Sequence, residues 1–80
     1  MDKQIQQIAE REVTRAIDAD ETANARYYET LRRFVPGLST EPEARLDSSG
    51  LKEIDSAWLK LNDTGKRLRR AYMKLYDSCN

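Results

Sequence analysis

The side chains most able to do chemistry in this sequence are carboxylates and cations, because it contains no histidine and only one cysteine, Cys79. Histidine is the commonest general base and metal ligand, and no base near Cys79 in the sequence would activate its thiol. The three glycines are isolated, so no glycine-rich phosphate loop is present. We therefore predict that the protein is not an enzyme and has no catalytic residue, cofactor or metal site.

Two carboxylates, Glu12 and Asp20, fall among apolar residues when the first part of the chain is projected as a helix. A di-metal site built from carboxylates would need further acids from several helices at matched depth. We favour a simpler interpretation, in which Asp20 forms an ion pair with Lys66 or Arg67 or lies at a solvated edge.

The strongest functional signal is the basic segment Lys66–Arg70, which Lys74 extends along the same predicted helix. On a helical projection Lys66, Arg67, Arg70 and Lys74 share the outer face. Such a row of cations can follow the phosphates of a nucleic acid. A solvated or salt-bridged face is the favoured interpretation, ahead of an acidic patch on a protein partner and of nucleic acid.

Leu59 and Met73 lie off the main apolar row of the same predicted helix. Scattered exposed apolar residues are normal, yet helices commonly dock on partners through mixed apolar and basic strips. We therefore predict a partner-binding set on this helix. Its members are Leu59, Lys66, Arg67, Arg70, Met73 and Lys74.

Composition indicates a single helical domain over residues 1–80 with a thin core. Leu, Ile, Val and Phe together account for 15 of 80 residues, while 14 basic residues balance 14 acidic ones. Neutral charge and strict apolar periodicity argue against disorder. A thin core favours self-association or a partner that completes it, so we predict a homodimer.

The chain is predicted to form two helices, over about residues 2–35 and 50–78. Pro36 and Gly37 end the first. The spacing of Thr40 and Glu43 predicts a short helical turn over residues 41–46, and residues 47–50 supply a cap for the second helix. The second helix carries an apolar heptad row, which we call the Leu51–Cys79 row: Leu51, Ile54, Trp58, Leu61, Gly65, Leu68, Tyr72, Leu75 and Cys79. A turn at residues 62–65 is the alternative, but it would not keep this row in phase.

These elements predict an all-α antiparallel hairpin in which the Leu51–Cys79 row faces the broad apolar stripe of the first helix. Folding the helices together places Leu51 near Phe34 and Trp58 near Tyr27, and brings Gly65 against small residues at a close crossing. The first helix has a wider apolar stripe than one partner can cover. We therefore expect two hairpins to form a four-helix bundle. A monomer covered by the short connecting helix is the alternative.

The segment from Leu51 to Tyr76 faintly resembles the helical segment that precedes the DNA-reading helices of phage late-gene regulators and sigma-like domains, through its Leu/Ile spacing, Arg69-Arg70 and Tyr72. No helix-turn-helix follows in this sequence, and we assign no family. Compact neutral helical chains without a site are common among phage and plasmid accessory proteins.

The preferred function is accordingly a non-enzymatic protein-interaction module, an adaptor or inhibitor that binds a partner protein. A nucleic-acid-binding regulator is the alternative. Charged residues throughout the first twenty positions argue against a signal peptide, and no apolar run is long enough for a membrane span. We predict a cytoplasmic location.

Overall fold

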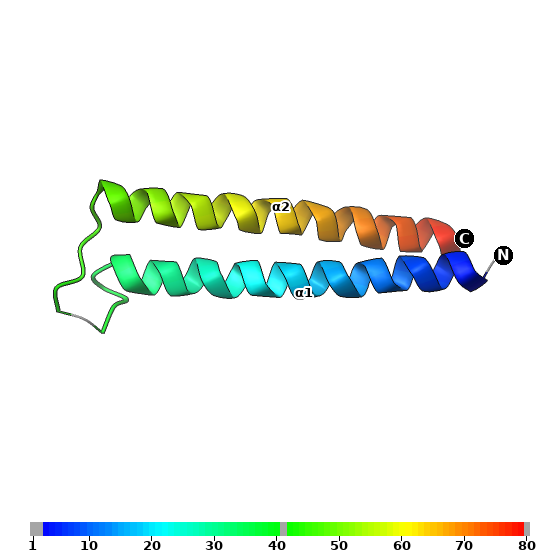
Figure 1. The fold of residues 1–80 in the computed structure, drawn as a ribbon, viewed down its shortest axis with the longest axis horizontal. Helices are drawn as coiled ribbons and strands as arrows, with labels where there is room; N and C mark the ends of the chain where they lie inside the picture. The colour runs from blue at the N-terminus through cyan, green and yellow to red at the C-terminus, as the bar shows by residue number, and fades with distance from the viewer. Residues whose placement is uncertain (1–2, 41, 80) are drawn as a thin grey trace.

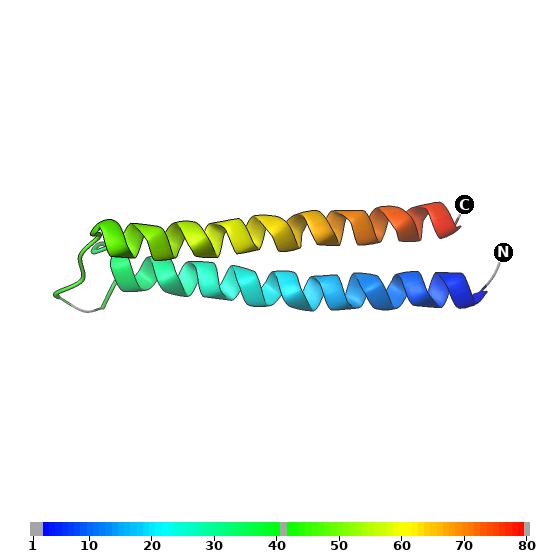
Figure 2. The same ribbon diagram turned by 45° about the horizontal axis from the view of Figure 1, so that its top comes forward.

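The computed structural model describes residues 3–40 and 42–79 and contains two long helices, α1 (Lys3–Phe34) and α2 (Ser48–Cys79). The helices lie side by side and run antiparallel, with the connecting segment at one end of the pair (Figure 1 and Figure 2). The hairpin is a flat rod with Cα extents of 58 × 19 × 13 Å. The predicted all-α hairpin is thus confirmed, and α2 passes through residues 62–65 without a break.

The first helix ends at Phe34 because Pro36 prevents its continuation. None of the three glycines has a positive φ, so Gly37 does not form the left-handed cap that glycine often provides. The N–H groups of Leu38 and Ser39 instead donate to the Val35 carbonyl at 2.9 and 3.1 Å, which forms one hydrogen-bonded turn. The helical turn predicted over residues 41–46 is wrong, since residues 42–47 contain no helix and Glu41 lies outside the described residues.

Asp47 caps α2, as predicted from the sequence. Its Oδ1 accepts a hydrogen bond from the Gly50 N–H at 2.7 Å, and its carbonyl accepts one from the Leu51 N–H at 2.9 Å. The carboxylate therefore satisfies an N–H group that the first helical turn would leave unpaired, and its charge suits the positive end of the helix dipole.

Replacing Asp47 with alanine is expected to lower the free energy of unfolding by about 1 kcal/mol, the usual cost of losing an N-cap side chain. Chemical denaturation followed by circular dichroism would measure the loss. Asp55→Ala is the control, because Asp55 is exposed within α2. Equal stability of Asp47→Ala and the wild type would show that the cap contributes nothing.

The hairpin is closed by small residues at seven-residue intervals, which we call the small-residue seam: Ala9, Ala16, Ala23 and Thr30 from α1, and Gly50, Ala57, Thr64 and Ala71 from α2. Ala16 and Ala57 are only 0 % and 2 % exposed. Small side chains at the contact allow helix axes to approach closely. The seam replaces the predicted interface, because in the Leu51–Cys79 row Trp58 and Tyr72 are about half exposed, at 47 % and 48 %.

The predicted register of the two helices is confirmed to within one residue. Phe34 lies against Gly50, one residue before the predicted Leu51, because a methyl group added to Gly50 would lie 2.7 Å from Cδ1 of the Phe34 ring. Farther along the rod, the Thr64 hydroxyl lies 2.9 Å from Oδ1 of Asp20.

The predicted role of Gly65 at a close helix crossing is wrong. Gly65 is half-buried, and a methyl group added there would meet one atom within 4 Å, Oδ1 of Asp20 at 3.8 Å, which is ordinary van der Waals contact. Gly50, in contrast, belongs to the small-residue seam and has no room for a side chain beside Phe34. Gly50, and not Gly65, is therefore the position at which close helix packing leaves no room for a side chain.

These two glycines are expected to respond oppositely to alanine. Gly65→Ala should raise the free energy of unfolding by about 1 kcal/mol, because alanine favours the helix interior and finds space there. Gly50→Ala should lower it, because the new methyl group would overlap the Phe34 ring. Denaturant unfolding of the two variants in parallel would test this, and destabilisation by Gly65→Ala would contradict the assignment.

Candidate interaction surfaces

The small-residue seam divides the hairpin into two broad faces of different chemistry. A residue four positions after a seam residue lies to one side of the seam, and a residue three positions after it lies to the other. Because the helices are antiparallel, each set falls on the same side of the pair in both helices. One face is therefore apolar and the other is charged.

The apolar face is built from the positions that follow the seam by four and eight residues. The half-buried members closest to the seam are Val13, Tyr27 and Phe34 from α1 and Ile54, Leu61, Leu68 and Leu75 from α2. Farther out lie Ile17, Trp58 and Tyr72, which are 39 %, 47 % and 48 % exposed. Aromatic and aliphatic side chains thus gather along one side of the rod on both sides of its middle. A grouped apolar surface of this kind indicates an interaction site, whereas single exposed apolar residues do not.

A polar hollow of about 400 Å³ interrupts this face near its middle. Asp20 lines it together with Trp58, Gly65, Lys66 and others. The Thr64 hydroxyl is 2.9 Å from Oδ1 of Asp20 and also 2.9 Å from the Leu61 carbonyl. Its single proton goes to one acceptor at a time, and the carboxylate is the stronger acceptor.

The predicted ion pair of Asp20 with Lys66 or Arg67 is therefore replaced by a hydrogen bond to Thr64. Glu12 and Asp20 line different hollows of the hairpin. Glu12 lines a hollow on the charged face, whereas Asp20 lines the hollow on the apolar face. Within the described ranges, no group of three or more His, Cys, Asp or Glu side chains is placed to hold a metal ion.

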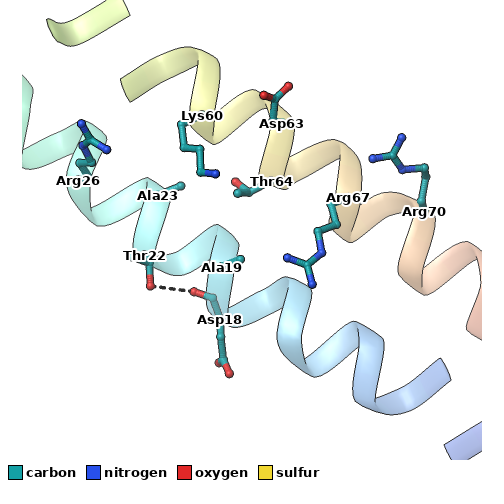
Figure 3. A pocket seen from close by; sticks show the side chains of 10 residues that line it. All are labelled: Asp18, Ala19, Thr22, Ala23, Arg26, Lys60, Asp63, Thr64, Arg67 and Arg70. Carbon is teal, nitrogen blue, oxygen red and sulfur yellow. Dashed lines mark hydrogen bonds between the residues drawn. The ribbon is translucent and has the colours of Figure 1, made fainter. Parts of the chain in front are cut away.

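The charged face contains a groove of about 590 Å³ between the helices (Figure 3). Its floor includes Ala19, Ala23 and Thr64, and its remaining lining residues are Asp18, Thr22, Arg26, Lys60, Asp63, Arg67 and Arg70. Lys60 and Arg67 extend from α2 across the groove toward α1, whereas the carboxylates of Asp18 and Asp63 point away from it (Figure 3). The Thr22 hydroxyl donates to the Asp18 carbonyl at 3.0 Å, a local helical contact.

A second hollow continues the groove toward the open end of the hairpin. It shares Arg67 and Arg70 with the first and adds Glu12, Arg15, Ala71 and Lys74. Cations from both helices therefore line one continuous surface. Sequence reasoning missed Arg15, Arg26 and Lys60; the signal for Arg26, Lys60 and Arg67 is that each follows a seam residue by three positions.

Every member of the predicted partner-binding set is exposed, and the set extends from the outer side of α2 onto the charged face. Arg67, Arg70 and Lys74 line the charged face, whereas Lys66 lines the hollow beside Trp58 on the apolar face. Leu59 and Met73 are 51 % and 44 % exposed. They lie two residues from the seam positions Ala57 and Ala71, on the side of α2 that is turned away from α1. Lys66 follows the seam residue Thr64 by the same two positions, so its Cα lies on this outer side as well, one turn before Arg70. The role of the set in binding a partner stays a prediction.

Neither described helix is long and apolar enough to cross a membrane. Comparisons with protein-family models, with curated proteins and with solved structures give no significant match.

Proposed function

We propose that the protein is a non-catalytic interaction module, an adaptor or inhibitor that acts on protein partners in the cytoplasm, of the kind that phages and mobile elements carry as accessory proteins. Its first partner is a second copy of itself, bound through the apolar face to give a four-helix bundle. The observation that carries this proposal is the inverted packing: alanine-sized residues fill the hairpin, while Trp58 and Tyr72 lie outside, 47 % and 48 % exposed.

The size of the apolar face suits a stable dimer. The apolar residues of this face extend from Val13 to Phe34 on α1 and from Ile54 to Leu75 on α2, along most of a rod that is 58 Å long. A second hairpin can therefore contact it over most of its length. Burial of apolar surface contributes about 25 cal/mol per Å² before the entropic cost of association, so half-exposed aromatic side chains provide a substantial driving force.

The polar hollow supports a second copy as the occupant. Asp20 and Thr64 lie near the midpoints of their helices. A two-fold axis through the hollow would therefore place the polar middle of one hairpin against the polar middle of the other, and the apolar ends of the two hairpins against each other. If this axis runs parallel to the rod, it places α1 of the second copy over α2, with the Asp20 carboxylate of the second copy beside Lys66 and Arg69. Opposite charges would then meet across the dimer axis.

Sedimentation equilibrium over a wide concentration range, with Trp58 emission recorded on the same samples, tests the dimer. Trp58 is the only tryptophan, so its emission reports on the apolar face alone. We expect a monomer–dimer equilibrium and a blue shift of the emission as the dimer forms. A monomeric mass and unchanged emission at every concentration would rule out self-association through this face.

The alternative function is nucleic-acid binding, which the charged face favours because Arg15, Arg67, Arg70 and Lys74 gather there from both helices. Phosphate contacts of this kind produce an affinity that falls steeply with salt. Binding of a mixed-sequence DNA duplex with that dependence, reduced by alanine at Arg67, Arg70 and Lys74, would support this function.

A further inference from the structure

The groove on the charged face has the shape of a binding site for one more helix. Its floor follows the small-residue seam, whose members recur every seven residues in both helices. A third helix packed along the groove would also place side chains toward it every seven residues, so its repeat would match that of the small residues. Successive hollows share Arg67 and Arg70, so the groove continues along the rod.

The rim of this groove attracts negative charge. In its central part Arg26, Lys60, Arg67 and Arg70 line it against two carboxylates, Asp18 and Asp63. Both carboxylates point away from the groove (Figure 3). Toward the open end of the hairpin, the lining of the groove contains four cations, Arg15, Arg67, Arg70 and Lys74, and one carboxylate, Glu12. An occupant with acidic side chains along its flanks would complement this arrangement.

We infer that the groove binds an amphipathic helix of another protein, with small or apolar residues on its inner face and Asp or Glu on its flanks. The apolar floor at Ala19 and Ala23 distinguishes this occupant from a nucleic acid. A phosphate backbone gains nothing from an alanine floor, whereas an amphipathic helix buries its apolar face there. Arginine and lysine at the rim then contact the flanking carboxylates.

This inference deepens the proposed function, since it names the chemistry of the partner that the module recruits. Association through the apolar face leaves the groove on the outer side of each hairpin. A dimer would therefore present two grooves facing away from each other and could bind two partner helices.

The probes are two labelled peptides of about three heptads, with alanine and leucine on one face and either Glu or Lys on the flanks, and a mixed-sequence DNA duplex. Fluorescence anisotropy is measured with the wild type, with the groove variant Arg67→Glu/Arg70→Glu, and with the control Arg11→Glu/Lys52→Glu. All four positions are exposed, and Arg11 and Lys52 do not line the groove, so the two variants change net charge equally at different places. Circular dichroism confirms that each variant is folded.

We expect the Glu peptide to bind, the Lys peptide not to bind, and the groove variant to bind the Glu peptide about tenfold or more weakly, with the control close to the wild type. Equal binding of the Glu and Lys peptides, or an unchanged affinity of the groove variant, would overturn the inference. Binding of the duplex without the Glu peptide, lost in the groove variant, would assign the groove to nucleic acid instead.

The dimer-interface variant Trp58→Glu/Tyr72→Glu separates this inference from the proposed self-association. If that variant binds the Glu peptide with the affinity of the wild type, the groove acts in the single hairpin. Peptide binding without any self-association would leave the groove assigned and the dimer rejected. Self-association without peptide binding would support the dimer and reject the groove as a helix-binding site.

Discussion

Replacing Ala16 with leucine is expected to lower the free energy of unfolding by about 2–3 kcal/mol, the upper part of the usual range for overpacking. Ala16 is 0 % exposed and lies in the small-residue seam. Leucine there would force α2 away from α1. The separation would loosen the neighbouring seam contacts of Ala9, Ala23, Thr64 and Ala71, so the effect would extend along the rod.

Ala25→Leu is the matched control, because Ala25 is an exposed position of the same helix. Both variants exchange alanine for another good helix former, so helix propensity changes equally. Urea unfolding followed by circular dichroism at one protein concentration measures both. If Ala16→Leu is as stable as Ala25→Leu, the helices do not pack through the small-residue seam, and the Leu51–Cys79 row becomes the candidate for the interface.

The double variant Trp58→Glu/Tyr72→Glu is expected to weaken self-association by about 100-fold or more. Buried aromatic side chains at interfaces commonly contribute 2 kcal/mol or more each, and about 1.4 kcal/mol corresponds to a tenfold change in affinity. Both residues are about half exposed in the hairpin, so its folding should change much less than the dimer. Sedimentation equilibrium would measure the dissociation constant, with the absorbance of Tyr27, Tyr28 and Tyr76 replacing that of Trp58.

The matched control is Leu59→Glu/Met73→Glu. These two residues lie one position after Trp58 and Tyr72 and have similar exposure, at 51 % and 44 %, but they belong to the outer side of α2. They should leave the dimer unchanged. A dimer that is lost in the control but kept in the double variant would return the interface to the strip of Leu59 and Met73 that the sequence suggested.

The sequence predicted the elements of this fold well because their signals are local. Pro36 excludes continuation of α1 whatever surrounds it, and the Asp47 side chain can reach the Gly50 N–H only if a helix starts there. The absence of proline from residue 37 to 80 except at Pro42 left α2 uninterrupted. The register followed because Pro36 and the Asp47 cap determine which ends of the two helices meet at the connection.

The candidate surfaces were harder to predict because they depend on the rotation of each helix about its own axis. Arg67 and Lys66 are neighbours in the sequence, yet they line opposite faces of the hairpin. Arg26 and Lys60 are 34 positions apart and line the same groove. No pattern within one helix shows which of its sides will meet the other.

The sequence by itself determined two long helices, where each begins and ends, and their antiparallel register. Only the tertiary structure decided which heptad repeat closes the hairpin. The Leu51–Cys79 row and the series Gly50, Ala57, Thr64 and Ala71 have the same period and differ only in phase. Hydrophobicity favoured the large residues, but small residues allow two helices with no other core to approach closely, and this leaves Trp58 and Tyr72 about half exposed.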